Sequence, residues 1–106
     1  MYVYKGVVTY VVDGDTIDVE IDLGFKISTK QRLRLARIDT PERGQEGYQE
    51  AKDFVTNCVL NKEVLINTEK VSKFGYYLAE VIVQAKNLSD MLLDGKLARP
   101  YHGEKK

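Results

Sequence analysis

Two short acidic segments are the part of this chain best suited to chemistry. They are Asp13-Gly14-Asp15-Thr16 and Asp39-Thr40-Pro41-Glu42, which lie on either side of a stretch with β-strand character. Carboxylates that a fold brings together repel one another and resist ionisation unless a cation lies among them. A hard cation such as Ca²⁺ takes carboxylate and carbonyl oxygens as ligands, and Arg34, ahead of the second segment, carries a planar guanidinium that suits a phosphate. These residue types therefore indicate phosphodiester chemistry.

The segments that must position these residues have mainly the pattern of β-strands. Residues 16–22 alternate between apolar and polar side chains without a break, which is typical of a half-buried strand. In residues 30–38, we expect Leu33 and Leu35 to face inward and Arg34 to lie on the opposite face. The expected strands are residues 2–12, 16–22, 30–38, 62–68 and 76–83, with a turn at residues 23–25.

Two helices complete the predicted architecture. Residues 45–60 place apolar side chains at helix-face spacing. Residues 89–94 predict a short second helix, with Ser89 as its N-cap and Gly95 placed to end it. Five strands with an inserted helix predict a mainly β fold with α, a five-stranded β-barrel of the OB type that is closed or partly open. This architecture often binds nucleic acid.

Length and composition predict an ordinary single domain over residues 1–106, with 43% hydrophobic and 30% charged residues. The N-terminus lacks a basic region followed by an apolar run, so we expect no signal peptide and a cytoplasmic location. The formal net charge is zero, so any attraction to phosphate must come from local clusters of cations, although solvated charges on a strand face explain most of them individually. The candidate cations are Lys30, Arg32, Arg34, Arg37, Arg43, Lys70, Lys73, Lys105 and Lys106.

The order of several short motifs resembles that of the staphylococcal nuclease (thermonuclease) family. The motifs are D-G-D-T, then R-L-x-x-I-D-T-P-E, then a helix, then K-x-G-x-x-L-A. D-G-D-T alone could be an ordinary acidic turn, but the order, the spacing and the intervening hydrophobic pattern together make the resemblance specific. It extends from about Val3 to Tyr101 and implies the OB-type barrel directly.

The resemblance implies a metal site. Asp15 and Asp39 match the family's metal-ligand aspartates, and Thr40 matches the residue that supplies a backbone carbonyl oxygen. Asp13 matches an acidic residue just outside the metal's ligands. One Ca²⁺ ion is the expected metal, and Mg²⁺ is less favoured because few all-protein sites meet its octahedral demands. The alternative for an Asp next to a Gly is a simple turn former.

The resemblance also assigns roles in catalysis to Glu42 and Arg34. Glu42 matches the glutamate proposed in the family to activate the attacking water as a general base. The alternative is a solvent-exposed loop glutamate next to Arg43. Arg34 matches one of two arginines that bind the scissile phosphate, with a salt bridge to a nearby aspartate as the competing account.

The chain departs from the family pattern before its last long strand. Tyr76 occupies the position of the second catalytic arginine, and a tyrosine offers one hydrogen bond and no positive charge near neutral pH. Loss of one donor to transition-state charge typically costs roughly 10²–10³ in rate, so Tyr76 predicts weakened catalysis. Lys73 and Phe74 match the pair that contacts a terminal phosphate, although Phe74 lacks the hydroxyl. Tyr101 lies near the family's base-stacking tyrosines, but it could equally be a packing residue.

Two functions from different classes follow. The leading one is a Ca²⁺-dependent nuclease that hydrolyses phosphodiester bonds in DNA or RNA, with single-stranded substrate favoured. The alternative is a non-catalytic nuclease-like domain that binds nucleic acid or a protein partner through its barrel. The match at Asp15, Arg34, Asp39 and Glu42, with the departure confined to Tyr76, favours the enzyme.

Overall fold

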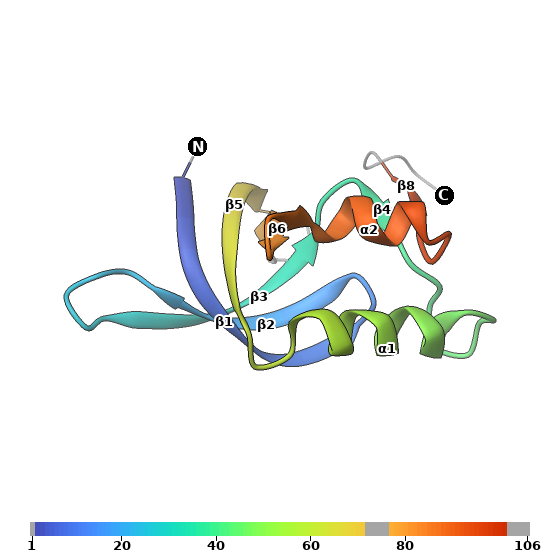
Figure 1. Cartoon of the computed structure of the whole chain (residues 1–106), viewed down its shortest axis with the longest axis horizontal. Coiled ribbons are helices and arrows are strands. Elements are labelled where there is room, and N and C mark those ends of the chain that lie inside the picture. The colour runs from blue at the N-terminus through green and yellow to red at the C-terminus, as the bar shows by residue number, and fades with distance from the viewer. Residues whose placement is uncertain (1, 72–76, 102–106) are drawn as a thin grey trace.

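The computed structural model describes residues 2–71 and 77–101, and only the backbone of Tyr2 and of residues 69–71. Two helices and eight strands make up this part of the chain (Figure 1). The strands are β1 (Tyr2–Asp13), β2 (Thr16–Asp22), β3 (Ser28–Leu35), β4 (Ile38–Asp39), β5 (Glu63–Val71), β6 (Tyr77–Val83), β7 (Lys86–Asn87) and β8 (Arg99–Pro100). The helices are α1 (Tyr48–Val59) and α2 (Leu88–Asp94).

Five of the strands close into a barrel. Their order is β3-β2-β1-β5-β6, and all neighbours in this row are antiparallel. The row closes because β6 also pairs with β3, in parallel, from Leu33↔Tyr77 to Leu35↔Ala79. The result is a closed mixed barrel of mostly β structure with two helices, which confirms the predicted OB-type fold.

The barrel interior follows the alternation in the sequence. On β2, Ile17, Val19 and Ile21 are buried, and on β3 the side chains of Leu33 and Leu35 are fully buried, as predicted. Both helices flank one side of the barrel, and the β2–β3 hairpin extends from it on the other side (Figure 1). Each helix contributes apolar residues to the same core, namely Val55 and Val59 from α1 and Leu88 and Leu92 from α2. No helix in the described residues is long and apolar enough to cross a membrane.

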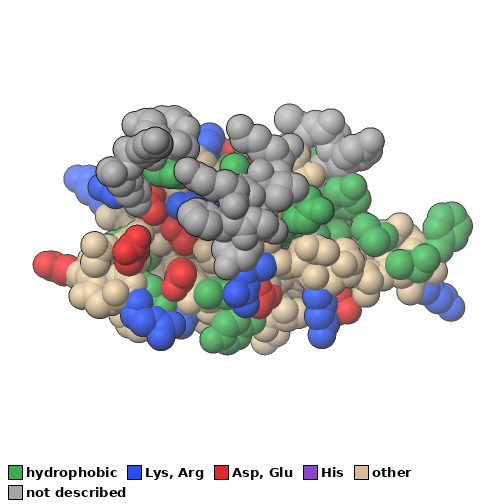
Figure 2. Space-filling view, turned by 180° about the vertical axis from the view of Figure 1, so that it is seen from behind, with side chains coloured by type: hydrophobic (Ala, Val, Ile, Leu, Met, Phe, Trp, Pro, Cys, Tyr) green, Lys and Arg blue, Asp and Glu red, His purple; other side chains and the backbone are tan. Residues whose placement is uncertain are grey.

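The surface carries charges of both signs and an exposed apolar group on the β2–β3 hairpin. Hydrophobic side chains gather over the β2–β3 hairpin, at the right of Figure 2, where Leu23, Phe25 and Ile27 are all exposed. Phe25 is 97% exposed and, with Lys26, has a positive φ. The predicted turn at residues 23–25 therefore exists, and it presents an aromatic ring to solvent.

The prediction of one continuous strand over residues 30–38 is wrong at its C-terminal end. β3 stops at Leu35, and the chain turns through Ala36 and Arg37 before β4 begins. Arg37 has a φ of 68°, in the left-handed region that most residues avoid. Tertiary hydrogen bonds hold the turn, because the Ala36 N–H donates to the Ala79 carbonyl and the buried Ser89 hydroxyl donates to the Ala36 carbonyl.

Both predicted helices need corrections at their N-termini. α1 starts at Tyr48 rather than at residue 45, because Gly44 and Gly47 both adopt positive φ and keep the preceding chain in turns. α2 is capped by Asn87, whose side-chain oxygen accepts the Asp90 N–H at 3.2 Å, and not by Ser89. The Ser89 hydroxyl is instead committed to the buried Ala36 carbonyl at 2.9 Å.

A charged cluster ties the β3–β4 turn to β6 and α2. The Arg37 guanidinium lies 2.6 and 2.9 Å from the two Glu80 oxygens and 3.0 Å from Asp90 Oδ1. The Asn87 amide also donates to Glu80 at 3.0 Å. Hydrogen bonds from Arg37, supported by the one from Asn87, lower the pKa of the Glu80 carboxyl against the opposing effect of its burial. The same contacts raise the pKa of Arg37.

This cluster predicts a specific acid sensitivity. A carboxyl whose pKa is lower in the folded state stabilises the fold fully above its unfolded pKa, and this stabilisation disappears as pH falls through the folded pKa. We therefore expect Glu80→Gln to lower the free energy of unfolding at pH 7 and to flatten its decline between roughly pH 5 and pH 3. Urea unfolding over a pH series measures this, with the exposed Glu63→Gln on β5 as control. Parallel pH profiles for Glu80→Gln and wild type would contradict it.

Candidate active site

Strand register brings the two acidic segments together. Thr16 on β2 pairs with Arg34 on β3, so the turn that carries Asp15 lies beside the C-terminal end of β3. The Leu35 N–H donates to the Asp15 carbonyl at 2.8 Å, which fixes the acidic turn against this strand. β4 then returns after the two-residue turn and places Asp39 next to both. Three neighbouring strand ends therefore supply the predicted site.

Arg34 lies between the two aspartates. Its Nη2 is 3.3 Å from Asp39 Oδ1 and 3.6 Å from Asp15 Oδ2, and its Nη1 donates to the Ile38 carbonyl at 3.1 Å. The two carboxylate side chains are only 9% and 12% exposed, so their mutual repulsion is weakly screened by solvent. A shared guanidinium offsets that repulsion. The salt bridge considered as a competing account for Arg34 is thus present.

Further donors hold each carboxylate in place. Asp15 accepts the Thr16 hydroxyl at 3.0 Å and the Thr40 N–H at 3.2 Å. The second Asp39 oxygen lies 3.1 Å from Arg99 Nη2 and 3.3 Å from its Nε. Arg99 reaches this place because β8 pairs with β4 with Asp39 opposite Arg99. Asp39 therefore has an arginine on each of its two oxygens.

Tyr101 completes one wall of the site. The Arg34 guanidinium carbon lies 5.2 Å from the centre of the Tyr101 ring, within the range of a cation–π contact. The Tyr101 N–H donates to the Arg37 carbonyl at 2.8 Å, which fixes the backbone below the ring. Tyr101 thus lies in the predicted site, where it contacts an arginine that could bind phosphate.

The other predicted residues differ in how closely they approach this centre. Glu42 is exposed, and its N–H donates to the Gln45 side chain at 2.7 Å. Asp13 turns toward α1, where it accepts the Tyr48 hydroxyl at 2.7 Å. Both residues nevertheless line one open hollow of about 510 Å³ with the central residues. Its lining is Val12, Asp13, Asp15, Arg34, Asp39, Thr40, Pro41, Glu42, Arg43 and Tyr101.

Some expected cations lie elsewhere. Arg32 pairs with Asp18 at 2.8 Å, and Arg37 pairs with Glu80 and Asp90. Neither arginine is part of the lining of the hollow. Tyr76, Lys73 and Phe74, and the side chain of Lys70, lie outside the described residues, as do His102, Lys105 and Lys106.

The donor set suits a hard cation bound largely by water. Among residues 2–71 and 77–101, no group of three or more acidic, histidine or cysteine side chains converges in a way that would hold a metal ion. Two carboxylates do converge, and the hydroxyl oxygen of neighbouring Thr40 is buried without a hydrogen-bond partner. Oxygen ligands of this kind fit Ca²⁺ or Mg²⁺ with several waters.

Comparison with known proteins decides the family. Residues 32–106 match the family described as staphylococcal nuclease homologues. The chain belongs to this family. It is 33% identical over 79 residues to Protein ParB of Escherichia coli and 33% identical over 78 residues to Micrococcal nuclease of Shigella flexneri. Each match covers 74% of this chain, which spans about two fifths (42%) of the length of these curated relatives. The family resemblance inferred from the motifs is thereby confirmed.

In this staphylococcal nuclease homologue, Arg99 is the site residue that sequence reasoning missed. It stands on a two-residue strand, and it meets Asp39 only through the pairing of β8 with β4. A strand of that length leaves no periodic signal in a sequence, so the only local indication was its position two residues before Tyr101.

Two arginines on one carboxylate allow a matched comparison. The Arg34 side chain is 19% exposed and the Arg99 side chain is 67% exposed. We expect Arg34→Ala to lower the free energy of unfolding at pH 7 by roughly 1–3 kcal/mol, because it leaves two buried carboxylates poorly compensated. Arg99→Ala should cost less than about 1 kcal/mol, as exposed pairs do. Urea denaturation of both variants measures the difference, and equal losses would contradict the central role of Arg34.

Proposed function

We propose that this nuclease homologue is a Ca²⁺-dependent phosphodiester hydrolase that acts on DNA or RNA, with single-stranded nucleic acid favoured. The observation that carries the proposal is the placement of Arg34 between the Asp15 and Asp39 carboxylates in an open hollow. Two clustered carboxylates attract a hard cation, and the arginine between them can turn to a phosphate that the cation also attracts. The name of the Shigella relative, Micrococcal nuclease, supports the same reading.

Asp15 and Asp39 would hold the Ca²⁺ together with the main-chain oxygen of Thr40. When bound, the metal would neutralise phosphate charge and supply an activated water. Asp13 lies two positions before Asp15 and outside this ligand set, where its bond to the Tyr48 hydroxyl ties the acidic turn to α1. The hydrogen bonds that Asp15 receives from Thr16 and Thr40 hold its carboxylate in a fixed orientation before any ligand arrives.

Arg34 and Glu42 have different roles toward the substrate in this proposal. Arg34 would bind two phosphate oxygens with its guanidinium and orient the phosphate for in-line attack. Glu42 would take the proton of the attacking water as the water oxygen bonds to phosphorus. The P–O bond to the leaving alcohol would break, and solvent would protonate the leaving oxygen. In the described part of the chain the Glu42 carboxylate makes no ion pair, and it stands exposed at the rim of the hollow, so it is free to accept a proton.

The polynucleotide itself would be held by weaker contacts around this centre. Tyr101, beside Arg34, offers a ring on which a base can stack, a contact worth about 1–3 kcal/mol in single-strand binders. Lys73 and Phe74 belong to the proposed binding surface through the family resemblance alone. Tyr76 stands at an arginine position of the family and makes this a slow enzyme in the proposal.

The decisive test compares cleavage of a single-stranded oligonucleotide in Ca²⁺, in Mg²⁺ and in EDTA. We expect cleavage in Ca²⁺ and none in EDTA. Asp39→Asn should abolish both the cleavage and the rise in melting temperature that Ca²⁺ causes, because a ligand that binds only the folded state stabilises it by mass action. Asp22→Asn, at an exposed acidic residue of the hairpin, is the control. Cleavage in EDTA would refute the metal site, and oligonucleotide binding without cleavage would indicate a binding domain instead.

A separate experiment addresses the proton acceptor. Glu42→Gln should keep the Ca²⁺-induced melting shift and the affinity for the oligonucleotide, but slow single-turnover cleavage by about 10²–10⁴-fold, because an amide cannot take a proton from water. Glu46→Gln removes the same charge from a nearby exposed residue and should cleave at the wild-type rate. If Glu42→Gln matches its control, another base operates.

A further inference from the structure

The turn between β3 and β4 sets the separation of two site residues. Arg34 is the penultimate residue of β3 and Asp39 is the last residue of β4, with only Ala36 and Arg37 between the strands. The Arg34 guanidinium also spans the turn, because its Nη1 donates to the Leu35 carbonyl at 3.4 Å and to the Ile38 carbonyl at 3.1 Å. Any change in the shape of the turn therefore moves the phosphate-binding group relative to the carboxylate.

The backbone of this turn has a conformation that an arginine does not favour. At a φ of 68°, the Cβ of Arg37 crowds its own backbone, and glycine is the residue that adopts this region without cost. A residue held in such a conformation requires surrounding contacts that compensate for the strain. At this turn, the ion pairs of the Arg37 side chain add to the backbone hydrogen bonds that Ala36 makes with Ala79 and Ser89.

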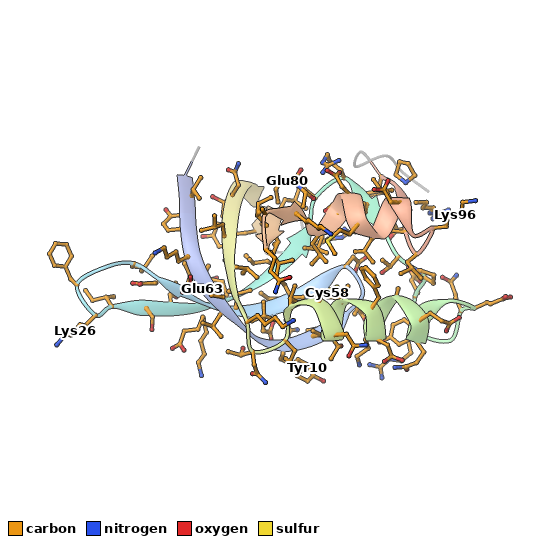
Figure 3. The ribbon with its side chains drawn as sticks, viewed as in Figure 1. Tyr10, Lys26, Cys58, Glu63, Glu80 and Lys96 are labelled. Atoms are coloured by element: carbon orange, nitrogen blue, oxygen red, sulfur yellow. The ribbon has the colours of Figure 1, made fainter. Side chains whose placement is uncertain are left out.

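The Arg37 side chain ties the turn to two residues that do not line the hollow. The Nε and Nη2 of Arg37 hold both oxygens of Glu80 at 2.6 and 2.9 Å, and Nη2 also reaches Asp90 at 3.0 Å. Glu80 belongs to β6 and Asp90 to α2, so one guanidinium joins the turn to two other elements. Glu80 is labelled in Figure 3, next to the start of α2. A bidentate pair of this kind fixes direction as well as distance.

The main chain of the same residue reaches the site. The Arg37 carbonyl accepts the Tyr101 N–H at 2.8 Å, and the Tyr101 ring lies 5.2 Å from the Arg34 guanidinium carbon. The following residues pair with β8, which sets Arg99 against Asp39. The position of Arg37 thus affects where Arg34, Arg99 and Tyr101 lie.

We propose that Arg37 is a positioning residue, which acts through the β3–β4 turn to hold Arg34, Asp39 and Tyr101 in their mutual arrangement. The ion pairs with Glu80 and Asp90 select the left-handed turn, and the turn then fixes the site. The catalytic part of this inference rests on the proposed nuclease function. The structural part, that Arg37 keeps the Tyr101 segment in a fixed position, does not depend on that function.

Three variants separate positioning from general stability. Arg37→Ala removes the ion pairs and keeps the Cβ that makes a positive φ unfavourable. Arg37→Gly removes the ion pairs and that Cβ together, and Arg37→Lys keeps the charge without the planar fork. The matched control is Arg32→Ala on β3, which breaks another half-exposed arginine–carboxylate pair, that with Asp18. It removes the same charge but leaves the turn intact.

Hydrogen exchange of the Tyr101 amide is the readout that needs no activity. We expect exchange at Tyr101 to accelerate at least about tenfold in Arg37→Ala and Arg37→Gly, and to stay at the wild-type rate in Arg32→Ala. Single-turnover cleavage in saturating Ca²⁺ should fall about 10- to 100-fold in Arg37→Ala and in Arg37→Gly, as expected for a small displacement of positioned groups. Arg37→Gly should lose this rate even though it melts closer to wild type than Arg37→Ala does.

The outcomes are distinct. If Arg37→Gly and Arg37→Lys cleave and exchange like Arg32→Ala, Arg37 does not position the site and the proposal is overturned. If no protein cleaves, wild type included, the nuclease function fails, and Tyr101 exchange alone then supports or refutes the positioning role. If Arg37→Ala or Arg37→Gly does not fold, the milder Arg37→Lys decides by the same two measurements.

Discussion

Two carboxylates share one small hollow in this protein, and the guanidinium of Arg34 between them is the interaction on which the site depends. Asp15 and Asp39 are both largely buried, and Arg34 Nη2 lies 3.6 Å from the first and 3.3 Å from the second. Without a cation at this place, like charges would face each other with little solvent to screen them. The register of β2 with β3 and the two-residue turn bring these three groups together, and the pairing of β4 with β8 adds Arg99.

The same arrangement explains how the fold accommodates two neighbouring, largely buried carboxylates. Groups from several parts of the fold hold the carboxylates, among them Thr40 in the loop after β4 and Arg99 on β8, and Tyr101 lies against Arg34. Arg34 is the member that both pairs with the aspartates and faces the open hollow. In the proposed complex, Arg34 would pair with the phosphate and the aspartates with the metal, in place of their present pairing with each other. The side chains that would bind these ligands are therefore already in place.

The sequence predicted those parts that short-range patterns determine. The alternation in residues 16–22 gave the bounds of β2, and the inward direction of Leu33 and Leu35 followed from the same rule. The turn at Arg37 was missed because arginine carries no local signal for a left-handed backbone. Tertiary contacts of Ala36 and of the Arg37 side chain stabilise that backbone instead. Ser89 was wrongly predicted as a helix cap because a tertiary contact, its bond to the Ala36 carbonyl, uses its hydroxyl. Arg99 depends on a pairing 60 residues distant. The catalytic and metal-binding roles of the site residues stay predictions.

The parallel contact of β3 with β6 has a consequence for how the molecule forms. Residues 33–35 meet residues 77–79 there, so the barrel cannot close until most of the chain has been ordered. Asp15 and Arg34 come together within the neighbouring β2 and β3, whereas the Asp39–Arg99 pair has to wait for the C-terminal strand. The hollow of the candidate site therefore takes its final form only when β8 has paired with β4, and Asp39 lacks its second arginine until then.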